Sequence, residues 1–143
     1  MMTITPHRKA LPRITPDTAP FWNGLREHKL MLPYCCDCGA PHLPPGPVCP
    51  GCFSGALDWR QASGRGQVAS WTEVHKAWFP AFAADVPYNV VQVELDEGPR
   101  LTSCITGLAG RKLAVGLRVE IDYGEQREGI TLPRFQPVAG AWV

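Results

Sequence analysis

Four of the six cysteines in this 143-residue chain are spaced as metal ligands. Cys35 and Cys38 are separated by two residues, and Cys49 and Cys52 repeat that spacing after ten intervening residues. A Cys-x-x-Cys pair makes a tight knuckle that directs both sulfurs at one metal ion. The two pairs together predict a closed, structural zinc site with four thiolate ligands.

The segment between the two pairs favours metal-dependent folding. Residues 40–48 are rich in proline, carry no charge and hold too few apolar side chains for a core of their own, so we expect metal binding to fold them. Disulfides are the alternative in an oxidising compartment. A single redox-active iron also stays open, because Cys49-Pro50-Gly51-Cys52 is similar to a rubredoxin knuckle.

Two neighbouring residues are weaker ligand candidates. Cys36 is a poor substitute for Cys35, since only one residue separates it from Cys38. His42 lies between the pairs, and we expect it to face solvent or to donate a hydrogen bond from outside the ligand set.

Other possible catalytic patterns carry less weight. Cys104 and His75 have the side chains of a nucleophile and its base, but Cys104 falls within a predicted strand, where a free cysteine commonly packs as a small apolar residue. The run from Gly64 to Ala69 formally fits a dinucleotide fingerprint, yet a strand rather than a helix follows it. We therefore assign no catalytic residue to this chain.

Charge and composition limit the possible partners and location. The formal net charge is +1, and no cluster of basic residues indicates a surface that binds nucleic-acid phosphates. The uncharged run from Cys38 to Leu57 contains five prolines, which excludes a membrane helix. The first nine residues are basic but lack the apolar core of a secretion signal. We expect a cytoplasmic protein.

The N-terminal part divides into an arm and a helix. Prolines at positions 6, 12 and 16 predict an extended arm over residues 1–16 that becomes ordered only against something else. Residues 18–29 then read as one amphipathic helix, with Thr18 as its cap and Phe21, Trp22 and Leu25 on its apolar face. This helix and the cysteine pairs make up residues 17–62.

Residues 63–143 have the period-two pattern of β-strands. The fold class is mainly β, and five short strands in so few residues favour a closed barrel of the OB type, because an open sheet would expose its edges. The expected strands cover residues 66–75, 88–95, 101–105, 117–123 and 130–136.

The loop between the first two of these strands is unusually apolar. Residues 77–88 contain Trp78, Phe79 and Phe82 together with two prolines, which stiffen the segment. Packing of one or two rings into the core is as plausible as contact with a partner. We take these three aromatic residues as the candidate partner contacts.

The order of several motifs resembles a family of small two-module proteins, to which the small subunit of benzoylsuccinyl-CoA thiolase is similar. The resemblance covers residues 16–138 and implies an N-terminal helix, a rubredoxin-like zinc ribbon and a C-terminal OB fold. The matching motifs are Phe21-Trp22-x-Gly24-Leu25, Cys35-x-x-Cys38-Gly39, Cys49-x-x-Cys52, Gly64-x-Gly66, Pro87-Tyr88, Glu97-Gly98 and Leu132-Pro133-x-Phe135.

This resemblance implies a function in association with other proteins. Members are non-catalytic accessory subunits of thiolase-like, lipid-transfer-type or hydratase enzymes that act on acyl-CoA thioesters, and they brace the partner and help to form its coenzyme A site. Arg65 and Arg100 are our candidates for CoA phosphate contacts, with Arg111 and Lys112 behind them. The alternative is a single-stranded nucleic-acid module in which Trp71, Trp78, Phe79 or Tyr88 stack on bases.

Overall fold

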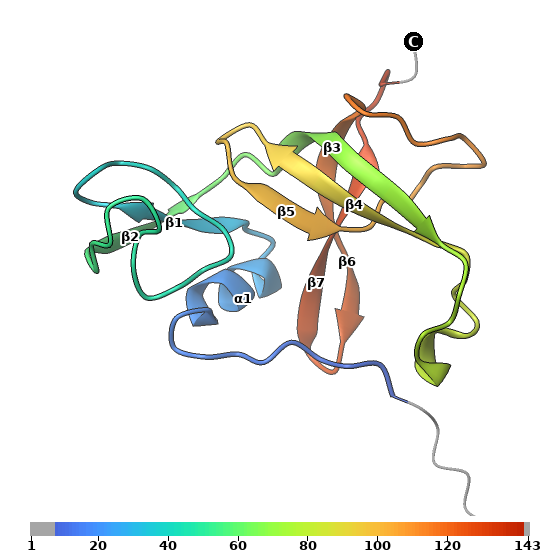
Figure 1. Cartoon of the computed structure of the whole chain (residues 1–143), viewed down its shortest axis with the longest axis horizontal. Coiled ribbons are helices and arrows are strands. Elements are labelled where there is room, and N and C mark those ends of the chain that lie inside the picture. The colour runs from blue at the N-terminus through green and yellow to red at the C-terminus, as the bar shows by residue number, and fades with distance from the viewer. Residues whose placement is uncertain (1–7, 142–143) are drawn as a thin grey trace, which may run out of the picture.

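The computed structural model describes residues 8–141 and is mainly β (Figure 1). It contains a two-stranded sheet and a five-stranded sheet, together with one α-helix before the first sheet and one 3-10 helix between two strands of the second. Within residues 8–141, no helix has the length and apolar character needed to span a membrane. The elements are α1 (Ala19–Arg26), β1 (Met31–Cys35), β2 (Leu57–Gln61), β3 (Arg65–Val74), η1 (Pro80–Phe82), β4 (Tyr88–Leu95), β5 (Arg100–Ser103), β6 (Arg118–Arg127) and β7 (Ile130–Pro137).

Helix α1 is shorter than the predicted 18–29 span. It ends at Arg26 because His28 takes a left-handed φ of 60°, and the Lys29 N–H returns to the Gly24 carbonyl at 2.9 Å. The hydroxyl of Thr18 does not cap the helix but accepts a hydrogen bond from the Thr15 N–H at 2.9 Å. The Thr15 carbonyl, in the turn before the helix, instead accepts the hydrogen bond of the first helical N–H, that of Ala19, at 2.8 Å.

Strands β1 and β2 form the antiparallel hairpin that carries the cysteine pairs. Cys35, the last residue of β1, lies opposite Leu57, the first residue of β2. The loops with the other three cysteines lie between these strands. The period-two pattern did not predict either strand, because both are short and the β2 sequence is largely polar.

The five-stranded sheet is a nearly closed OB-like barrel, as predicted. Its strand order is β5-β4-β3-β6-β7, with every neighbouring pair antiparallel. A parallel bridge between Ile105 and Phe135 joins the two ends of this order. Strand β4 occupies residues 88–95, the span expected from its alternating valines.

One continuous apolar core joins the helix to the barrel. Val91 and Val93 are fully buried on one face of β4, and Phe135 of β7 packs with them. Phe21 and Leu25 of α1 belong to the same cluster, because the helix lies against β7. The cysteine hairpin is therefore attached to the barrel through the helix that precedes it.

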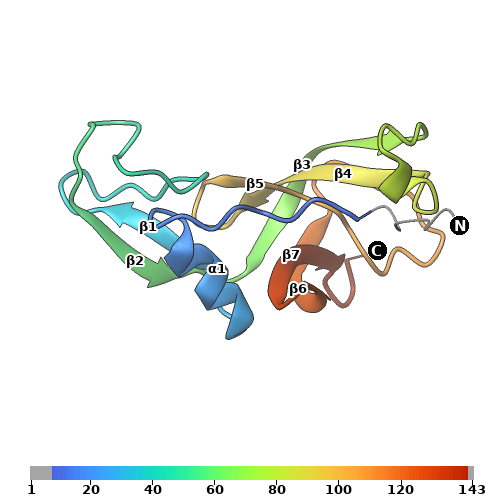
Figure 2. The same ribbon diagram turned by 90° about the horizontal axis from the view of Figure 1, so that it is seen from below.

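The described part of the N-terminal arm, residues 8–16, packs on its own chain (Figure 2). The Arg127 guanidinium donates to the Ala10 carbonyl at 3.4 Å, and the Lys9 ammonium lies over the Phe82 ring at 5.3 Å and pairs with Asp85. The arm is extended over these residues, and the barrel with its aromatic loop supplies the contacts against which it is ordered. Residues 1–7 lie outside the described residues.

Candidate metal centre and exposed surfaces

The four predicted ligand sulfurs converge on one point. The Sγ atoms of Cys35 and Cys52 are 3.5 Å apart, those of Cys38 and Cys49 are 3.6 Å apart, and all four lie within 4.8 Å of one another. A tetrahedral four-thiolate zinc site with bonds of about 2.3 Å places its sulfurs about 3.8 Å apart. The geometry of these residues therefore fits a zinc ion with a full set of protein ligands.

The distances also exclude disulfides in this structure. A disulfide bond is about 2.05 Å long, whereas the closest cysteine sulfurs here are 3.5 Å apart, and all six cysteines are free thiols. The disulfide alternative from the sequence is thus not adopted.

Backbone groups of the knuckles prepare the sulfurs for metal binding. The N–H of Cys38 donates to the Cys35 sulfur at 3.4 Å, and this bond is the main reason that the pKa of Cys35 is lowered to about 6. A hydrogen bond from the Ser54 N–H lowers the pKa of Cys52. The neighbouring Cys35 sulfur, burial and the other sulfurs together outweigh that bond, so the pKa of Cys52 rises to about 12. Four thiolates at this spacing repel one another, and a divalent cation removes that repulsion.

The two weaker ligand candidates stay outside the cluster. Cys36 is exposed and does not belong to the convergent group. His42 is only 7% exposed, so the expectation that it faces solvent is wrong, and neither ring nitrogen has a hydrogen-bond partner among the described residues. With four sulfurs already convergent, the site has no open ligand position for catalysis.

The predicted aromatic loop presents two of its three rings to solvent. Trp78 is 67% exposed and Phe79 is 66% exposed. Phe82 is half-buried and packs against Tyr88 at 6.0 Å between ring centroids, while Lys9 lies over its other side. Phe82 thus supports the loop from inside, and Trp78 and Phe79 form its outer surface.

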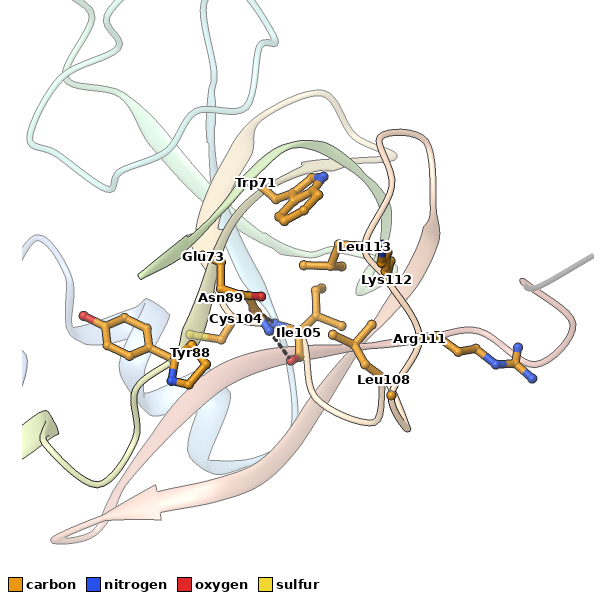
Figure 3. A pocket seen from close by; sticks show the side chains of 12 residues that line it. Trp71, Glu73, Tyr88, Asn89, Cys104, Ile105, Leu108, Arg111, Lys112 and Leu113 are labelled. Carbon is orange, nitrogen blue, oxygen red and sulfur yellow. Dashed lines mark hydrogen bonds between the residues drawn. The ribbon is translucent and has the colours of Figure 1, made fainter. Parts of the chain in front are cut away.

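A hollow of about 710 Å³ lies beside this loop (Figure 3). Trp71, Ile105 and Leu113 give it an apolar wall, and Arg111 points outward from its rim. The Asn89 side chain is held by the Ile105 backbone, to which it donates at 3.0 Å and from which it accepts at 2.7 Å. The sequence pattern did not identify this hollow. Strand 101–105 was expected to include Ile105, but β5 ends at Ser103, and Ile105 and Leu113 lie in the long connection between β5 and β6.

Cys104 lines the same hollow but is not prepared for nucleophilic attack. The pKa of its thiol is raised, mainly by burial, and activation of a cysteine requires a lowered pKa. His75, the base considered with it, pairs with Glu73 at 2.9 Å.

The two candidate CoA contacts lie at the opposite end of the barrel. Arg65 begins β3, whereas the aromatic loop follows its last residue, Val74, and a ten-residue strand is about 30 Å long. Arg100 begins β5 next to the β4–β5 turn, and its guanidinium pairs with Glu94 at 3.3 Å. The structure therefore does not bring Arg65 and Arg100 together with Trp78 and Phe79.

The four-sulfur hairpin, the connecting helix and the barrel define a protein in which a zinc ribbon precedes an OB fold. Residues 22–58 match the family model described as "ChsH2, rubredoxin-like zinc ribbon domain", and residues 59–123 match "ChsH2, C-terminal OB-fold domain". The chain belongs to this family of ChsH2-type zinc-ribbon and OB-fold proteins, whose relatives include DUF35 proteins.

Curated relatives carry names of subunits and scaffolds. A "Probable enoyl-CoA hydratase alpha subunit" of Thermomonospora curvata is 38% identical over 128 residues, which cover 88% of this chain and 39% of that relative. A "DUF35 domain-containing scaffold protein" of Pyrococcus furiosus is 31% identical over 109 residues, which cover 76% of this chain and 79% of that protein. The chain thus spans about two fifths of the hydratase subunit's length and most of the scaffold protein's length.

Two solved structures share the fold. One chain from a structure described as "Ltp2-ChsH2(DUF35) aldolase" is 37% identical, with a TM-score of 0.79, and the match covers 90% of this chain and 100% of that chain. A DUF35 protein of unknown function from Sulfolobus solfataricus is 18% identical with a TM-score of 0.60, over 85% of each chain, and shows the fold alone.

Proposed function

We propose that this chain is a non-catalytic, zinc-binding accessory subunit of a thiolase-like or lipid-transfer-type acyl-CoA enzyme. In the hetero-oligomer it braces the partner and helps to form the partner's site for coenzyme A esters. Residues 17–62 serve as the zinc module and residues 63–143 as the barrel. The observation that carries this proposal is the match over the whole of a chain from an aldolase structure described by two components, Ltp2 and ChsH2.

The metal in this proposal is one structural zinc ion. Cys35, Cys38, Cys49 and Cys52 supply four thiolates at tetrahedral spacing, and bound zinc would hold the knuckles together without taking part in a reaction. The iron alternative makes a different prediction, because an iron centre with four thiolates is coloured. Metal analysis together with the visible spectrum of the purified protein separates the two.

The partner surface in this proposal is the barrel end that carries the aromatic loop. Trp78 and Phe79 are large, exposed aromatic side chains, the type that dominates binding energy at protein interfaces. The hollow beside the loop offers a concavity in which an apolar wall lies next to polar and charged side chains, among them Glu73 and Lys112. Phe82 contributes by holding the loop against Tyr88 and Lys9.

The coenzyme A contacts are assigned to the other end of the barrel. Arg65 and Arg100 are exposed guanidinium groups able to pair with phosphate oxygens. Because they are far from the aromatic loop, partner binding and CoA binding should respond to different substitutions. That separation makes each half of the proposal testable alone.

The first test is the composition of the native complex. The tagged chain is purified from its source organism at moderate salt, and the co-purifying material is identified by mass spectrometry and ultraviolet absorbance. A stoichiometric acyl-CoA enzyme supports the accessory role. Nucleic acid without a protein partner supports the base-stacking alternative, and a chain that elutes alone contradicts the proposal.

The second test separates the two surfaces in the reconstituted complex. The double variant Trp78→Ala/Phe79→Ala should weaken association with the enzyme by at least about 30-fold, since each interface aromatic contributes on the order of 1–2 kcal/mol or more. Arg65→Ala/Arg100→Ala should leave association unchanged and raise the Kd for the CoA ester. Val115→Ala, an exposed apolar site at 69% exposure, is the matched control. Unchanged association of the aromatic variant would overturn the assigned surface.

A further inference from the structure

The two cysteine knuckles have the same backbone path but differ at one residue. In the first knuckle the Gly39 N–H donates to the Cys35 carbonyl at 2.8 Å, and in the second the Phe53 N–H donates to the Cys49 carbonyl at 2.8 Å. The Cys35 N–H donates to the carbonyl of Ala40, the residue after Gly39, at 3.0 Å. The Cys49 N–H donates to the carbonyl of Ser54, the residue after Phe53, at 2.8 Å. Gly39 and Phe53 are therefore structurally equivalent positions.

Both positions require a left-handed backbone. Gly39 has a φ of 78° and Phe53 has a φ of 63°. Glycine adopts this conformation without steric cost, whereas a residue with a Cβ pays for it. The second knuckle has a phenylalanine where glycine would fold more favourably, so local backbone stability does not account for the ring.

The Phe53 ring contributes nothing visible to the core. It is 77% exposed, more than Trp78 or Phe79, and it takes part in none of the aromatic or cation–π contacts among residues 8–141. Phe53 does not line the hollow beside the aromatic loop. A ring that protrudes in this way is shaped to enter a pocket on another molecule.

The surroundings of Phe53 indicate the chemistry of that molecule. We define the ribbon tip as residues 47–55, which lie inside the charge-free run from Cys38 to Leu57. Val48, 42% exposed, adds a second apolar side chain. The Ser54 hydroxyl next to Phe53 donates a hydrogen bond to the Asp37 carboxylate, so the tip presents its two apolar side chains beside one bonded carboxylate. Such a tip complements an apolar pocket on a protein. It lacks the lysines and arginines that draw a peripheral segment to anionic lipid.

The position of the ribbon tip argues for a partner that also contacts the barrel. Two apolar side chains cover far less than the about 800 Å² per partner that a stable interface buries, so the tip is too small to hold a second copy of this chain by itself. In both views the hairpin loops between β1 and β2 lie at the opposite end of the molecule from η1 and the aromatic loop (Figures 1 and 2). One large partner is able to reach both ends.

We propose that Phe53 is an anchor that inserts into an apolar pocket of the same acyl-CoA enzyme that contacts the aromatic loop. This inference rests on the proposed function for the identity of the partner. The zinc knuckle provides a rigid mount, so the ring loses little conformational freedom when it docks. The ribbon tip is then a second docking surface, and the cost of its left-handed backbone is offset in the complex.

The test relies on two effects of opposite sign. Phe53→Gly should raise the melting temperature of the isolated chain, because glycine relieves the left-handed backbone, while it weakens association with the enzyme at least tenfold. Phe53→Tyr keeps an aromatic ring and should retain association within about threefold. Val115→Ala should change neither quantity, and zinc content is measured for every variant. A Phe53→Gly chain that melts lower or loses zinc with unaltered association would overturn the anchor.

Photocrosslinking in the source cells separates this inference from the proposed function. A photoreactive phenylalanine analogue replaces Phe53 in one strain and Trp78 in another, and the captured molecules are identified. Capture of the same acyl-CoA enzyme from both positions supports the anchor. Capture from position 78 alone overturns the anchor and keeps the proposed function. Capture of lipid, or of this chain alone, from position 53 also overturns the anchor, and failure of both positions to capture an acyl-CoA enzyme overturns both proposals.

Discussion

The ribbon and the barrel of this protein are held together by different physical means. Residues 36–61, a stretch that the structure describes completely, bury only the side chains of His42 and Cys49. The barrel buries a continuous apolar cluster that includes Val91, Val93 and Phe135 at 0% exposure. Hydrophobic burial is therefore sufficient for the barrel, whereas the ribbon depends on its four sulfurs and the ion they bind.

This contrast also separates the kinds of surface each region offers. The ribbon contributes Leu32 of β1 to the core, and Leu43 and Trp59 pack against that core while partly buried. Val48 and Phe53 of the ribbon tip are exposed. The barrel hides its apolar side chains and presents aromatic rings at the loop between β3 and β4. A module that metal ligands hold together can leave the apolar side chains of its tip exposed, because the metal ion supplies part of its stability.

The largest expected effect is on the ribbon alone. Cys52→Ser should abolish stoichiometric zinc binding, because structural four-ligand sites bind zinc with about 10–16 kcal/mol in zinc-finger peptides. Hydrogen exchange of residues 31–61 should then become fast while residues 88–95 stay protected. Cys36→Ser is the matched control and should keep its zinc, since Cys36 lies outside the cluster. Equal zinc content in both variants would contradict the four-thiolate site.

The next largest effect falls on the barrel. Phe135→Ala should lower the free energy of unfolding by about 3–5 kcal/mol, because it leaves a cavity at a fully buried position that also closes the sheet. Zinc stoichiometry should be unaffected, as no ligand changes. Urea titration checks the prediction, with Phe79→Ala as the exposed control expected to cost less than about 0.5 kcal/mol. Similar midpoints for the two variants would show that the barrel does not rely on this core.

The smallest effect concerns a surface ion pair of the barrel. The Arg118 guanidinium donates to both carboxylate oxygens of Asp96, at 2.9 and 3.0 Å. These hydrogen bonds are the main reason that the pKa of Asp96 is lowered. A carboxylate with a lowered folded pKa contributes stability above its unfolded pKa of about 3.9 and loses that contribution as the pH falls through the folded value. Because the two side chains are 41% and 44% exposed, the contribution should be less than about 1 kcal/mol.

The measurement is the difference in urea midpoint between the wild-type chain and Asp96→Asn at two pH values. The gap should be present at pH 7 and shrink at pH 3. Loss of zinc at low pH affects both proteins alike, so the gap rather than either midpoint is compared. A gap of equal size at both values would exclude a titrating ion pair.

The sequence by itself determined the cysteine cluster and the barrel class. Cys-x-x-Cys spacing leaves little freedom for where the sulfurs point, and the alternating valines of β4 leave little freedom for which face is buried. The prediction of strand 88–95 was correct for that reason. Local geometry decides both features within a few residues.

Only the tertiary structure decided the features that depend on distant contacts. It buried His42, ended α1 before His28 and laid residues 8–16 along the barrel. It also placed Arg65 and the aromatic loop at opposite ends of β3 and gave Phe53 its exposed position. Residue type and spacing do not encode these arrangements, because burial and exposure follow from which elements pack together far apart in the chain.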